Sequence, residues 1–174
     1  MNKAELRSHC KQLRSNLSEA ERLVLSQSIC SRLETINWSA VHALHCFESI
    51  KKLGEVDTDT FIAHIQKQYP KIQIYTSRRI DNTWKIVSWR DHTLAESLQF
   101  DAVIVPMLGF DSSLQRIGYG GGYYDKFLAA QPQTRKIGVC FEFGRLEHIP
   151  AEAHDIPLDA IVTESQTYSG LHFS

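Results

Sequence analysis

The spacing of hydrophobic residues predicts two amphipathic helices at the start of the chain. Residues 2 to about 15 carry hydrophobic side chains at intervals of four, three and four, which is the period of one helix face. They are Leu6, Cys10, Leu13 and Leu17. Ser18 and Glu21 then form a capping-box pattern ahead of a second helix, which is expected to run to about Thr35. Its hydrophobic face consists of Leu25, Ile29, Leu33 and Ile36.

A basic stripe runs beside the hydrophobic stripe on the first helix. Its members are Lys3, Arg7, Lys11 and Arg14. Such a stripe is usually a solvated face, although the same side chains reach inward where a helix lies over an anionic ligand. The periodicity is compatible with both arrangements.

Strands are predicted where β-branched and aromatic residues cluster between turn signals. The expected strands are 41–47, 71–76, 84–89, 101–106, 135–141 and a final short one at 159–163. A helix capped by Asp57 or Thr58 follows the first strand, another helical pattern spans 126–130, and 142–150 is expected to be a turn or short helix. Strands that alternate with helices predict an α/β fold. It is a single open, mostly parallel sheet with helices on both faces, forming one domain of residues 1–174.

Composition and charge narrow the classes of protein. A formal net charge of −1 gives no overall attraction to nucleic acid or to an anionic membrane. No stretch approaches the roughly 18–20 apolar residues of a membrane span, and the first residues do not form a signal segment. The four cysteines are scattered without a C-x-x-C pair, which fits a reducing compartment. We therefore expect a cytoplasmic monomer that binds small molecules.

A glycine-rich loop follows the most hydrophobic strand. Residues 101–106 read Asp-Ala-Val-Ile-Val-Pro, and residues 116–125 read Arg-Ile-Gly-Tyr-Gly-Gly-Gly-Tyr-Tyr-Asp. Glycines allow close approach of the backbone, and a helix start adds free N–H groups, so this combination predicts an anion site. Arg116 supplies donors for phosphate oxygens, and Asp125 supplies a carboxylate that suits a phosphate-bound Mg²⁺.

A flexible turn is the alternative interpretation of four clustered glycines. It leaves the flanking charges and the two tyrosines of the loop without a role. The loop also departs from two common nucleotide motifs. No lysine is followed by Ser or Thr as in a P-loop, and Tyr123 stands where a dinucleotide loop has its third glycine. We interpret the segment as a different kind of phosphate loop.

Glu55 and the two histidines of the first strand are less specific signals. Glu55 lies where open α/β sheets bind ligands, although acids in such loops are usually solvated. His42 and His45 are three residues apart, so they face opposite sides of a strand and are expected to be ordinary sheet histidines.

Together these fragments resemble the 5-formyltetrahydrofolate cyclo-ligase family, also called methenyltetrahydrofolate synthetases. The matching segments, in order and at similar spacing, are 3–7, 54–58, 101–106, 110–111, 116–125, 137–138 and 154–164. The 116–125 loop is the specific one, whereas Lys-x-x-Leu-Arg at 3–7 is weak alone. The resemblance implies conversion of 5-formyltetrahydrofolate to 5,10-methenyltetrahydrofolate, with Mg²⁺ as cofactor and ATP as co-substrate, giving ADP and phosphate.

The resemblance also implies residue roles at the phosphate end. Lys3 and Arg7 would contact the ATP phosphates from the first helix. The ATP loop would consist of Arg116, Ile117, Gly118, Tyr119, Gly120, Gly121, Gly122, Tyr123 and Tyr124. Asp125 and Asp155 would hold Mg²⁺, directly or through water. Catalysis would involve Arg116, Tyr123 and Asp125.

At the folate end, the resemblance implies that Glu55 hydrogen-bonds the pterin and that Ile50, with Phe47, lines its ring. Tyr119 and the loop residues Gly120, Gly121, Gly122 and Tyr123 would border the formyl group. Two departures lie here. The segment 91–100 is too short for the family's Glu-Pro wall, and 50–53 is two residues longer than the usual turn.

Two smaller departures lie near the phosphate loop, where Leu114 replaces a common glycine and Lys126 a frequent arginine. The alternatives are an ATP-dependent enzyme of the same fold with another small substrate, and a non-catalytic nucleotide or folate binder. Arginines 78, 79 and 90 could belong to an RNA-binding module, but solvated strand ends are favoured by the neutral overall charge.

Overall fold

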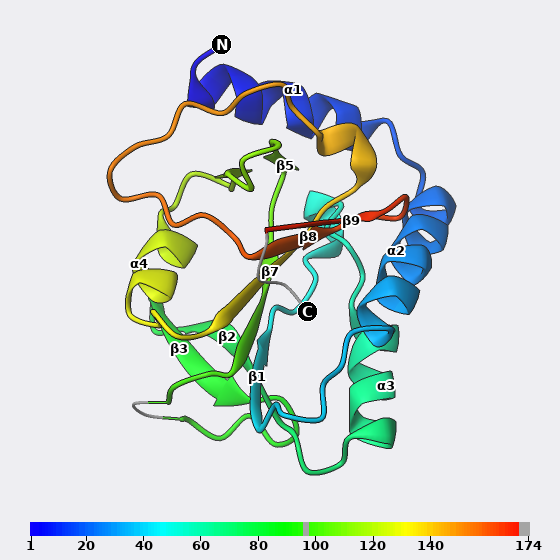
Figure 1. Ribbon diagram of the computed structural model, residues 1–174, viewed down its shortest axis with the longest axis vertical. Coiled ribbons are helices and arrows are strands. Elements are labelled where there is room, and N and C mark those ends of the chain that lie inside the picture. Colours follow the sequence, from blue (N-terminus) through cyan, green and yellow to red (C-terminus); the bar gives the residue numbers. More distant parts are fainter. Residues whose placement is uncertain (96–97, 171–174) are drawn as a thin grey trace.

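The computed structural model describes residues 1–95 and 98–170. A seven-stranded sheet in the order β3-β2-β1-β4-β7-β8-β9 forms its centre (Figure 1). The strands are β1 (Ala43–Cys46), β2 (Gln73–Ile80), β3 (Thr83–Ser88), β4 (Ala102–Pro106), β7 (Arg135–Val139), β8 (Ala160–Val162) and β9 (Thr167–Ser169). The helices are α1 (Lys3–Ser15), α2 (Glu19–Glu34), α3 (Asp59–Gln68) and α4 (Tyr123–Ala129), with 3₁₀ turns η1 (Lys51–Leu53) and η2 (Glu142–Gly144).

The five inner strands of the sheet are parallel, and the two edge strands are antiparallel. β1 pairs in parallel with both β2 and β4, β4 pairs with β7, and β7 pairs with β8. β3 and β9 close the edges in the antiparallel sense. The predicted mostly parallel α/β sheet is therefore confirmed. β1 and β4 are neighbours at the centre of the sheet, and the strand order runs from β1 to β2 on one side and from β4 to β7 on the other. The carboxyl ends of β1 and β4 therefore lie at the position where such folds bind ligands.

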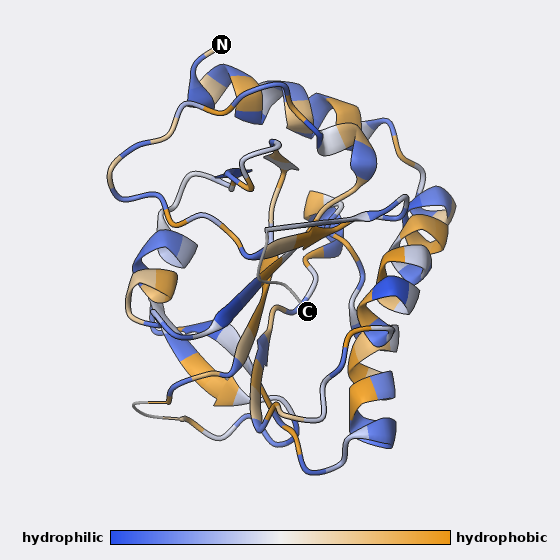
Figure 2. Ribbon diagram, viewed as in Figure 1, coloured by the Kyte–Doolittle hydropathy of each residue, from blue (hydrophilic) through white to orange (hydrophobic). Residues whose placement is uncertain are grey.

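Helices cover both faces of the sheet, as predicted, and α1 crosses its carboxyl end. Alternate residues of β4 face opposite layers, so Ile104 packs in the core with α2 and α3, while Val103 packs in the core with α4. Figure 1 shows α2 and α3 together on one side, α4 on the other and α1 across the top. Figure 2 shows that hydrophobic residues dominate the central strands, whereas the helices alternate hydrophobic with hydrophilic positions.

The side chain of the preceding residue caps the N-terminus of each of the first two helices, Asn2 for α1 and Ser18 for α2. In α2, the amide of Glu21 donates to Ser18 Oγ (3.2 Å) and the amide of Ser18 donates to Glu21 Oε2 (2.9 Å), which confirms the predicted capping box. α3 begins at Asp59. Thr58 makes no side-chain cap there, and Asp57 Oδ1 instead accepts from the Asp59 amide (3.1 Å).

The β2–β3 hairpin differs from the sequence prediction. β2 continues to Ile80, so Arg78 and Arg79 lie within the strand and are not at its end. A two-residue turn of Asp81 and Asn82, both with positive φ (47° and 60°), joins β2 to β3. Positive φ at both central residues is the geometry that matches the twist of an antiparallel pair. A strict alternation of strands and helices does not predict such a hairpin.

Two further strand features were not predicted. β8 was expected to be the final strand, but β9 follows it and pairs antiparallel with it. β5 (Gly109–Phe110) and β6 (Arg116–Ile117) form a separate short ladder ahead of the glycine loop. Strands of two or three residues carry too few alternating positions to be recognised by period.

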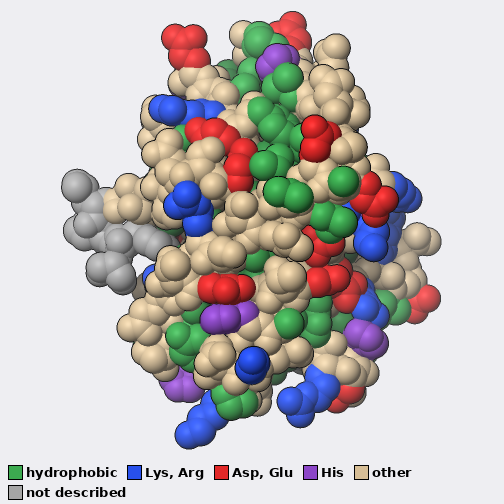
Figure 3. All heavy atoms as spheres, turned by 90° about the vertical axis from the view of Figure 1, so that its right-hand side faces the viewer, with side chains coloured by type: hydrophobic (Ala, Val, Ile, Leu, Met, Phe, Trp, Pro, Cys, Tyr) green, Lys and Arg blue, Asp and Glu red, His purple; other side chains and the backbone are tan. Residues whose placement is uncertain are grey.

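The four cysteines, Cys10, Cys30, Cys46 and Cys140, are buried and unpaired, and burial raises the pKa of each thiol. On the face that α2 and α3 cover, acidic, basic and hydrophobic side chains are interspersed (Figure 3). Among the described residues, no helix is both long enough and apolar enough to cross a membrane.

Asp101 provides a test of how β1 and β4 are joined. Its Oδ2 accepts from the amides of His42 (2.7 Å) and Ala43 (2.9 Å). Burial alone would raise the pKa of Asp101, but these bonds and the nearby His42 ring hold it below its ordinary value. The stabilisation is therefore complete above the unfolded-state pKa of roughly 3.9 and is lost as pH falls through the lower folded-state pKa.

We expect Asp101→Asn to lower the free energy of unfolding by about 1 kcal/mol at pH 7, a value reduced for the half-exposed carboxylate. The difference from the wild type should shrink as pH falls below about 3.9. Urea denaturation at a series of pH values measures both. A difference that does not change with pH would contradict the electrostatic explanation.

Candidate active site

A cavity of about 760 Å³ opens at the carboxyl ends of β1 and β4. Its size is in the range of small-molecule sites, roughly 300–1,000 Å³. α1, the β2–β3 hairpin, the η1 turn and the glycine loop line it. Of the sequence-predicted site residues, Ile117 alone does not line it, because its side chain is buried beneath α1 beside Leu6 and Cys10.

The glycine loop 118–122 connects β6 to α4, and its backbone requires glycine at two positions. Gly120 and Gly122 have φ of 97° and 63°, which side chains with a Cβ rarely adopt. A Cβ at Gly120 would also lie 3.4 Å from Arg7 Nε. A Cβ at Gly118 or Gly121 would meet open space, so nothing in the folded chain demands glycine there. Those two positions leave the backbone open to the cavity.

Basic side chains of α1 turn inward, so the stripe is not the solvated face that its periodicity also allowed. Lys3 Nζ contacts Asp155 Oδ2 (2.6 Å) and Glu152 Oε2 (2.9 Å), and Arg7 Nε donates to the carbonyl of Gly118 (3.1 Å). Arg14 is buried, and only Lys11 of the stripe is exposed. Three of the four members of the stripe therefore contact the rest of the protein, and the stripe is not simply a solvated face.

Ion pairs hold the charges of the phosphate end in place. Burial would lower the pKa of Lys3, but its bonds to Asp155 and Glu152 prevail and raise it. Burial would raise the pKa of Asp155, but the bonds from Lys3 and from the Glu152 amide, with the nearby positive charges, together outweigh this and lower it. Both partners are therefore charged at neutral pH.

Arg116 is almost fully buried and pairs with the Asp125 carboxylate as well as with the carbonyl of Ile156. Burial lowers the pKa of Arg116, and the attraction of Asp125 opposes this shift. A guanidinium keeps its charge under these conditions because its ordinary pKa exceeds 12.

The two predicted metal ligands line the same cavity but belong to different groups. Asp155 lies with Glu152 and His154, whose ligand atoms are all within 4.8 Å of one another. Asp125 is outside that group and is paired with Arg116. Carboxylate oxygens are the donors that Mg²⁺ prefers, so the residues at this end of the cavity fit the cation chemically.

The opposite end of the cavity is built around Glu55. Its side chain is buried, Oε2 accepts from the amide of Ile50 (2.7 Å), and it hydrogen-bonds the Tyr119 hydroxyl. Arg14 donates to Tyr119 Oη (2.7 Å) and to the carbonyl of Met107 (2.7 Å). Burial raises the pKa of Glu55, against the opposing effects of these bonds and of Arg14. Glu55 is thus a positioned carboxylate and not a solvated loop acid.

Tyr123 is held by a chain of hydroxyl contacts that the sequence did not indicate. Its Oη lies 2.5 Å from Ser77 Oγ, which lies 2.7 Å from His45 Nε2. Burial lowers the pKa of His45 to about 3, so this histidine is neutral. The Trp84 ring packs on the Tyr123 ring with centroids 4.9 Å apart. His45 is more than an ordinary sheet histidine, since it anchors this chain.

The β2–β3 hairpin forms one wall of the cavity. Ser77, Arg78, Arg79 and Trp84 all line the cavity, and Arg78 pairs with Glu48. Residues 96–97 of the shortened 91–100 segment lie outside the described residues, and Leu94 forms a bridge with Val87 of β3. Arg14, Ser77 and Trp84 are among the site residues that the sequence pattern did not assign. For Arg14, the inward alternative for the basic stripe was the signal.

Comparison with known proteins agrees with this geometry. The sequence profile described as the 5-formyltetrahydrofolate cyclo-ligase family matches residues 1–164. The chain is 30% identical to a 5-formyltetrahydrofolate cyclo-ligase of Mycoplasma pneumoniae, over 94% of this chain and 99% of that one. It is 27% identical to the mouse cyclo-ligase over 96% of each chain.

Two solved structures have the same fold. The 5,10-methenyltetrahydrofolate synthetase of Mycoplasma pneumoniae superimposes with a TM-score of 0.82 at 27% identity, covering 94% of this chain and 99% of that one. The Aquifex aeolicus synthetase gives 0.78 at 28% identity, covering 97% and 93%. The sequence profile and the mutual coverage with the first relative establish that this chain belongs to the 5-formyltetrahydrofolate cyclo-ligase family.

Proposed function

We propose that this chain uses Mg²⁺ and ATP to convert 5-formyltetrahydrofolate to 5,10-methenyltetrahydrofolate, with release of ADP and phosphate. Family membership supports the folate conversion, and the ATP dependence is the finer part of the proposal. The observation that carries it is a single cavity with a cationic glycine loop at one end and the buried carboxylate of Glu55 at the other.

The chemistry needs positioning and charge neutralisation more than a protein nucleophile. In the proposed reaction the formyl oxygen takes the γ-phosphoryl group of ATP, N10 of the folate attacks the activated carbon, and phosphate leaves as the ring closes. The glycine loop, with Lys3 and Arg7, would hold the ATP phosphates. Asp125 and Asp155 would hold Mg²⁺, which supplies neutralisation of phosphate charge when bound.

Arg116 and Tyr123 are proposed to act on the reacting groups. Arg116 is fixed by Asp125 and would direct its remaining donors to the transferred phosphoryl group. Tyr123 is oriented by Ser77 and Trp84 and would border the formyl carbon with Tyr119, Gly120, Gly121 and Gly122.

At the folate end, Glu55 would accept hydrogen bonds from the pterin, whose edge is rich in N–H donors. Ile50 and Phe47 line the cavity beside it and would pack on the ring. We further infer a cytoplasmic monomer with small-molecule partners and without nucleic acid. The unpaired state of the four buried cysteines supports a reducing compartment.

The direct test is the ATP-dependent appearance of the near-ultraviolet absorbance of methenyltetrahydrofolate from 5-formyltetrahydrofolate and Mg²⁺. We expect a signal that disappears when ATP is omitted. Binding of folate without turnover would instead favour a non-catalytic binder. Binding of Mg-ATP without folate binding would favour another small substrate.

Asp125→Asn should lower kcat by about a hundredfold or more, since it removes a charge from both Arg116 and the proposed metal site. Circular dichroism checks that the fold is retained. Asp59→Asn, which makes the same change at an exposed position of α3, is the matched control and should behave as wild type. Undiminished Mg²⁺-dependent turnover of Asp125→Asn would eliminate the metal assignment.

Glu55→Gln should raise the KM for reduced folate more than the KM for ATP, because it weakens only the pterin end. Burial raises the pKa of Glu55, so this carboxylate takes up a proton at a higher pH than an ordinary glutamate. The folate affinity of the wild type should therefore begin to fall at that higher pH as the solution is acidified, and Glu55→Gln should lack this dependence. Steady-state kinetics across pH measures both, with Glu147→Gln on the surface as control. Equal increases of the two KM values would argue against the pterin role.

A further inference from the structure

A second cavity, of about 520 Å³, lies behind the η1 turn. It adjoins the active-site cavity, because Leu53 and Tyr119 line both. Its charged lining residues are Lys11, Arg14, Arg22, Lys51, Lys52 and Glu19. Five of these six are cationic in a chain whose net charge is −1. A concave surface lined by one sign of charge concentrates the electrostatic potential and attracts anions.

The arginines of this cavity are already used by the protein, whereas the lysines are not. Arg14 donates to Tyr119 and Met107, and Arg22 donates to the carbonyl of Glu55 and lies 3.8 Å from Asp57. Across residues 1–95 and 98–170, no hydrogen bond or ion pair within 4 Å engages the three lysine amino groups. These belong to Lys11, Lys51 and Lys52, which are all exposed.

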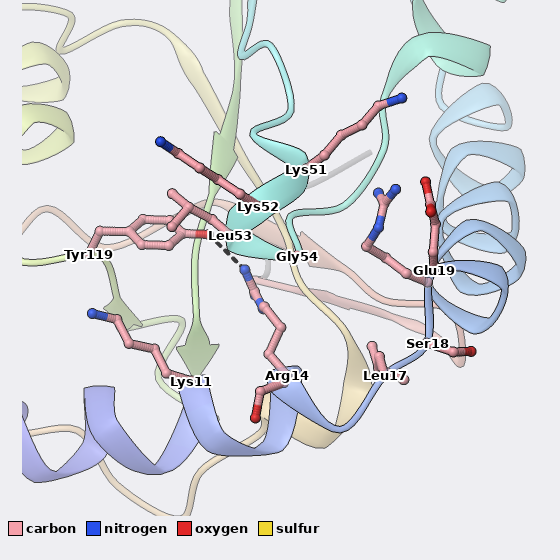
Figure 4. Close-up of a pocket in the computed structure, with 12 residues that line it drawn as sticks. Lys11, Arg14, Leu17, Ser18, Glu19, Lys51, Lys52, Leu53, Gly54 and Tyr119 are labelled. Carbon is pink, nitrogen blue, oxygen red and sulfur yellow. Dashed lines mark hydrogen bonds between the residues drawn. The ribbon is translucent and has the colours of Figure 1, made fainter.

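The lysines approach the cavity from two separate elements. Figure 4 shows Arg14 projecting from α1 toward η1 and Lys11 leaving α1 on the side of Tyr119, while Lys51 and Lys52 extend from η1 in different directions. Lys51 and Lys52 belong to η1 itself, so this turn places two cations at the rim of the cavity.

We propose that this cavity binds a small molecule with several anionic oxygens, of phosphate or carboxylate type, and that the bound anion steadies the folate end of the active site. The three unengaged amino groups stand on exposed, flexible side chains that can turn toward such a ligand, while the fixed charges of Arg14 and Arg22 add attraction from the cavity wall. The effect on folate rests on the proposed function, whereas the binding itself does not.

The connection to the active site runs through the η1 turn. The amide of Ile50 at its start donates to Glu55 Oε2 in the neighbouring cavity (2.7 Å). Gly54 at its end has φ of 61°, and a Cβ there would lie 3.0 Å from Arg14 Cγ, so the turn packs directly on Arg14. An anion that joins Lys51 and Lys52 to Lys11 would tie this turn to α1. The same turn holds Glu55 in place.

Calorimetric titration with inorganic triphosphate at low ionic strength tests the site. We expect the wild type to bind two equivalents, one at the glycine loop and one in the second cavity. The double variant Lys51→Ala/Lys52→Ala should retain the first and bind the second roughly tenfold more weakly. Lys67→Ala/Lys85→Ala removes the same charge at exposed positions that line neither cavity, and should bind as wild type.

Citrate in place of triphosphate distinguishes the two ligand types. Binding of both probes assigns the cavity to polyanions in general, and binding of triphosphate alone assigns it to phosphates. Wild-type affinity of Lys51→Ala/Lys52→Ala for the second equivalent would overturn the proposal. If the wild type bound a single equivalent, and Lys51→Ala/Lys52→Ala weakened it, the second cavity would be supported and the result would count against the proposed ATP loop.

The coupling is tested in the cyclo-ligase assay with the anion that binds. We expect it to lower the KM for reduced folate two- to threefold in the wild type, to leave the KM for ATP unchanged, and to have no effect on Lys51→Ala/Lys52→Ala. Binding of the anion without a change in the folate KM would overturn the coupling.

Discussion

The buried guanidinium of Arg14 is the contact on which the arrangement of the site depends. Burying an unpaired charge is costly, so Arg14 must hold its partners in fixed positions. One partner is the Met107 carbonyl just after β4, and the other is the Tyr119 hydroxyl in the glycine loop. Tyr119 in turn meets Glu55. A single side chain of α1 therefore joins the sheet end, the glycine loop and the Glu55 carboxylate.

Electrostatic pairing at the other end of the cavity has a different character. Lys3 with Asp155 and Arg116 with Asp125 are opposite charges whose partners can be exchanged. If ATP and Mg²⁺ bind as proposed, Lys3 and Arg116 would exchange a carboxylate for a phosphate oxygen, and Asp155 and Asp125 would become available to the metal ion. Exchange of one strong ionic contact for another costs little net free energy, although each separate contact is strong. Without ligands, the ion pairs keep these charges paired.

Much of this architecture could be predicted from the sequence, and the reasons differ from part to part. The helix stripes and the buried strand 102–106 depend on hydrophobic period, which is a local property. The loop 116–125 could be recognised because glycines and charges fall together. Ser77, Trp84 and Arg14 could not be assigned, because their role arises only when the hairpin and α1 meet in space. The hairpin, in contrast, has a local signal in Asp81-Asn82, because both residues tolerate positive φ.

The four buried cysteines can report local opening of the fold. A thiol reacts as its thiolate, and burial raises the pKa of all four, that of Cys140 to about 12. Cys46 lies in β1 and Cys140 directly follows β7, in the layers between sheet and helices, whereas Cys10 lies on the buried face of α1. An alkylating reagent can reach these thiols only when the surrounding layer opens. The rate at which each cysteine is alkylated therefore reports how often its part of the fold opens. A comparison of these rates would rank the layers by local stability.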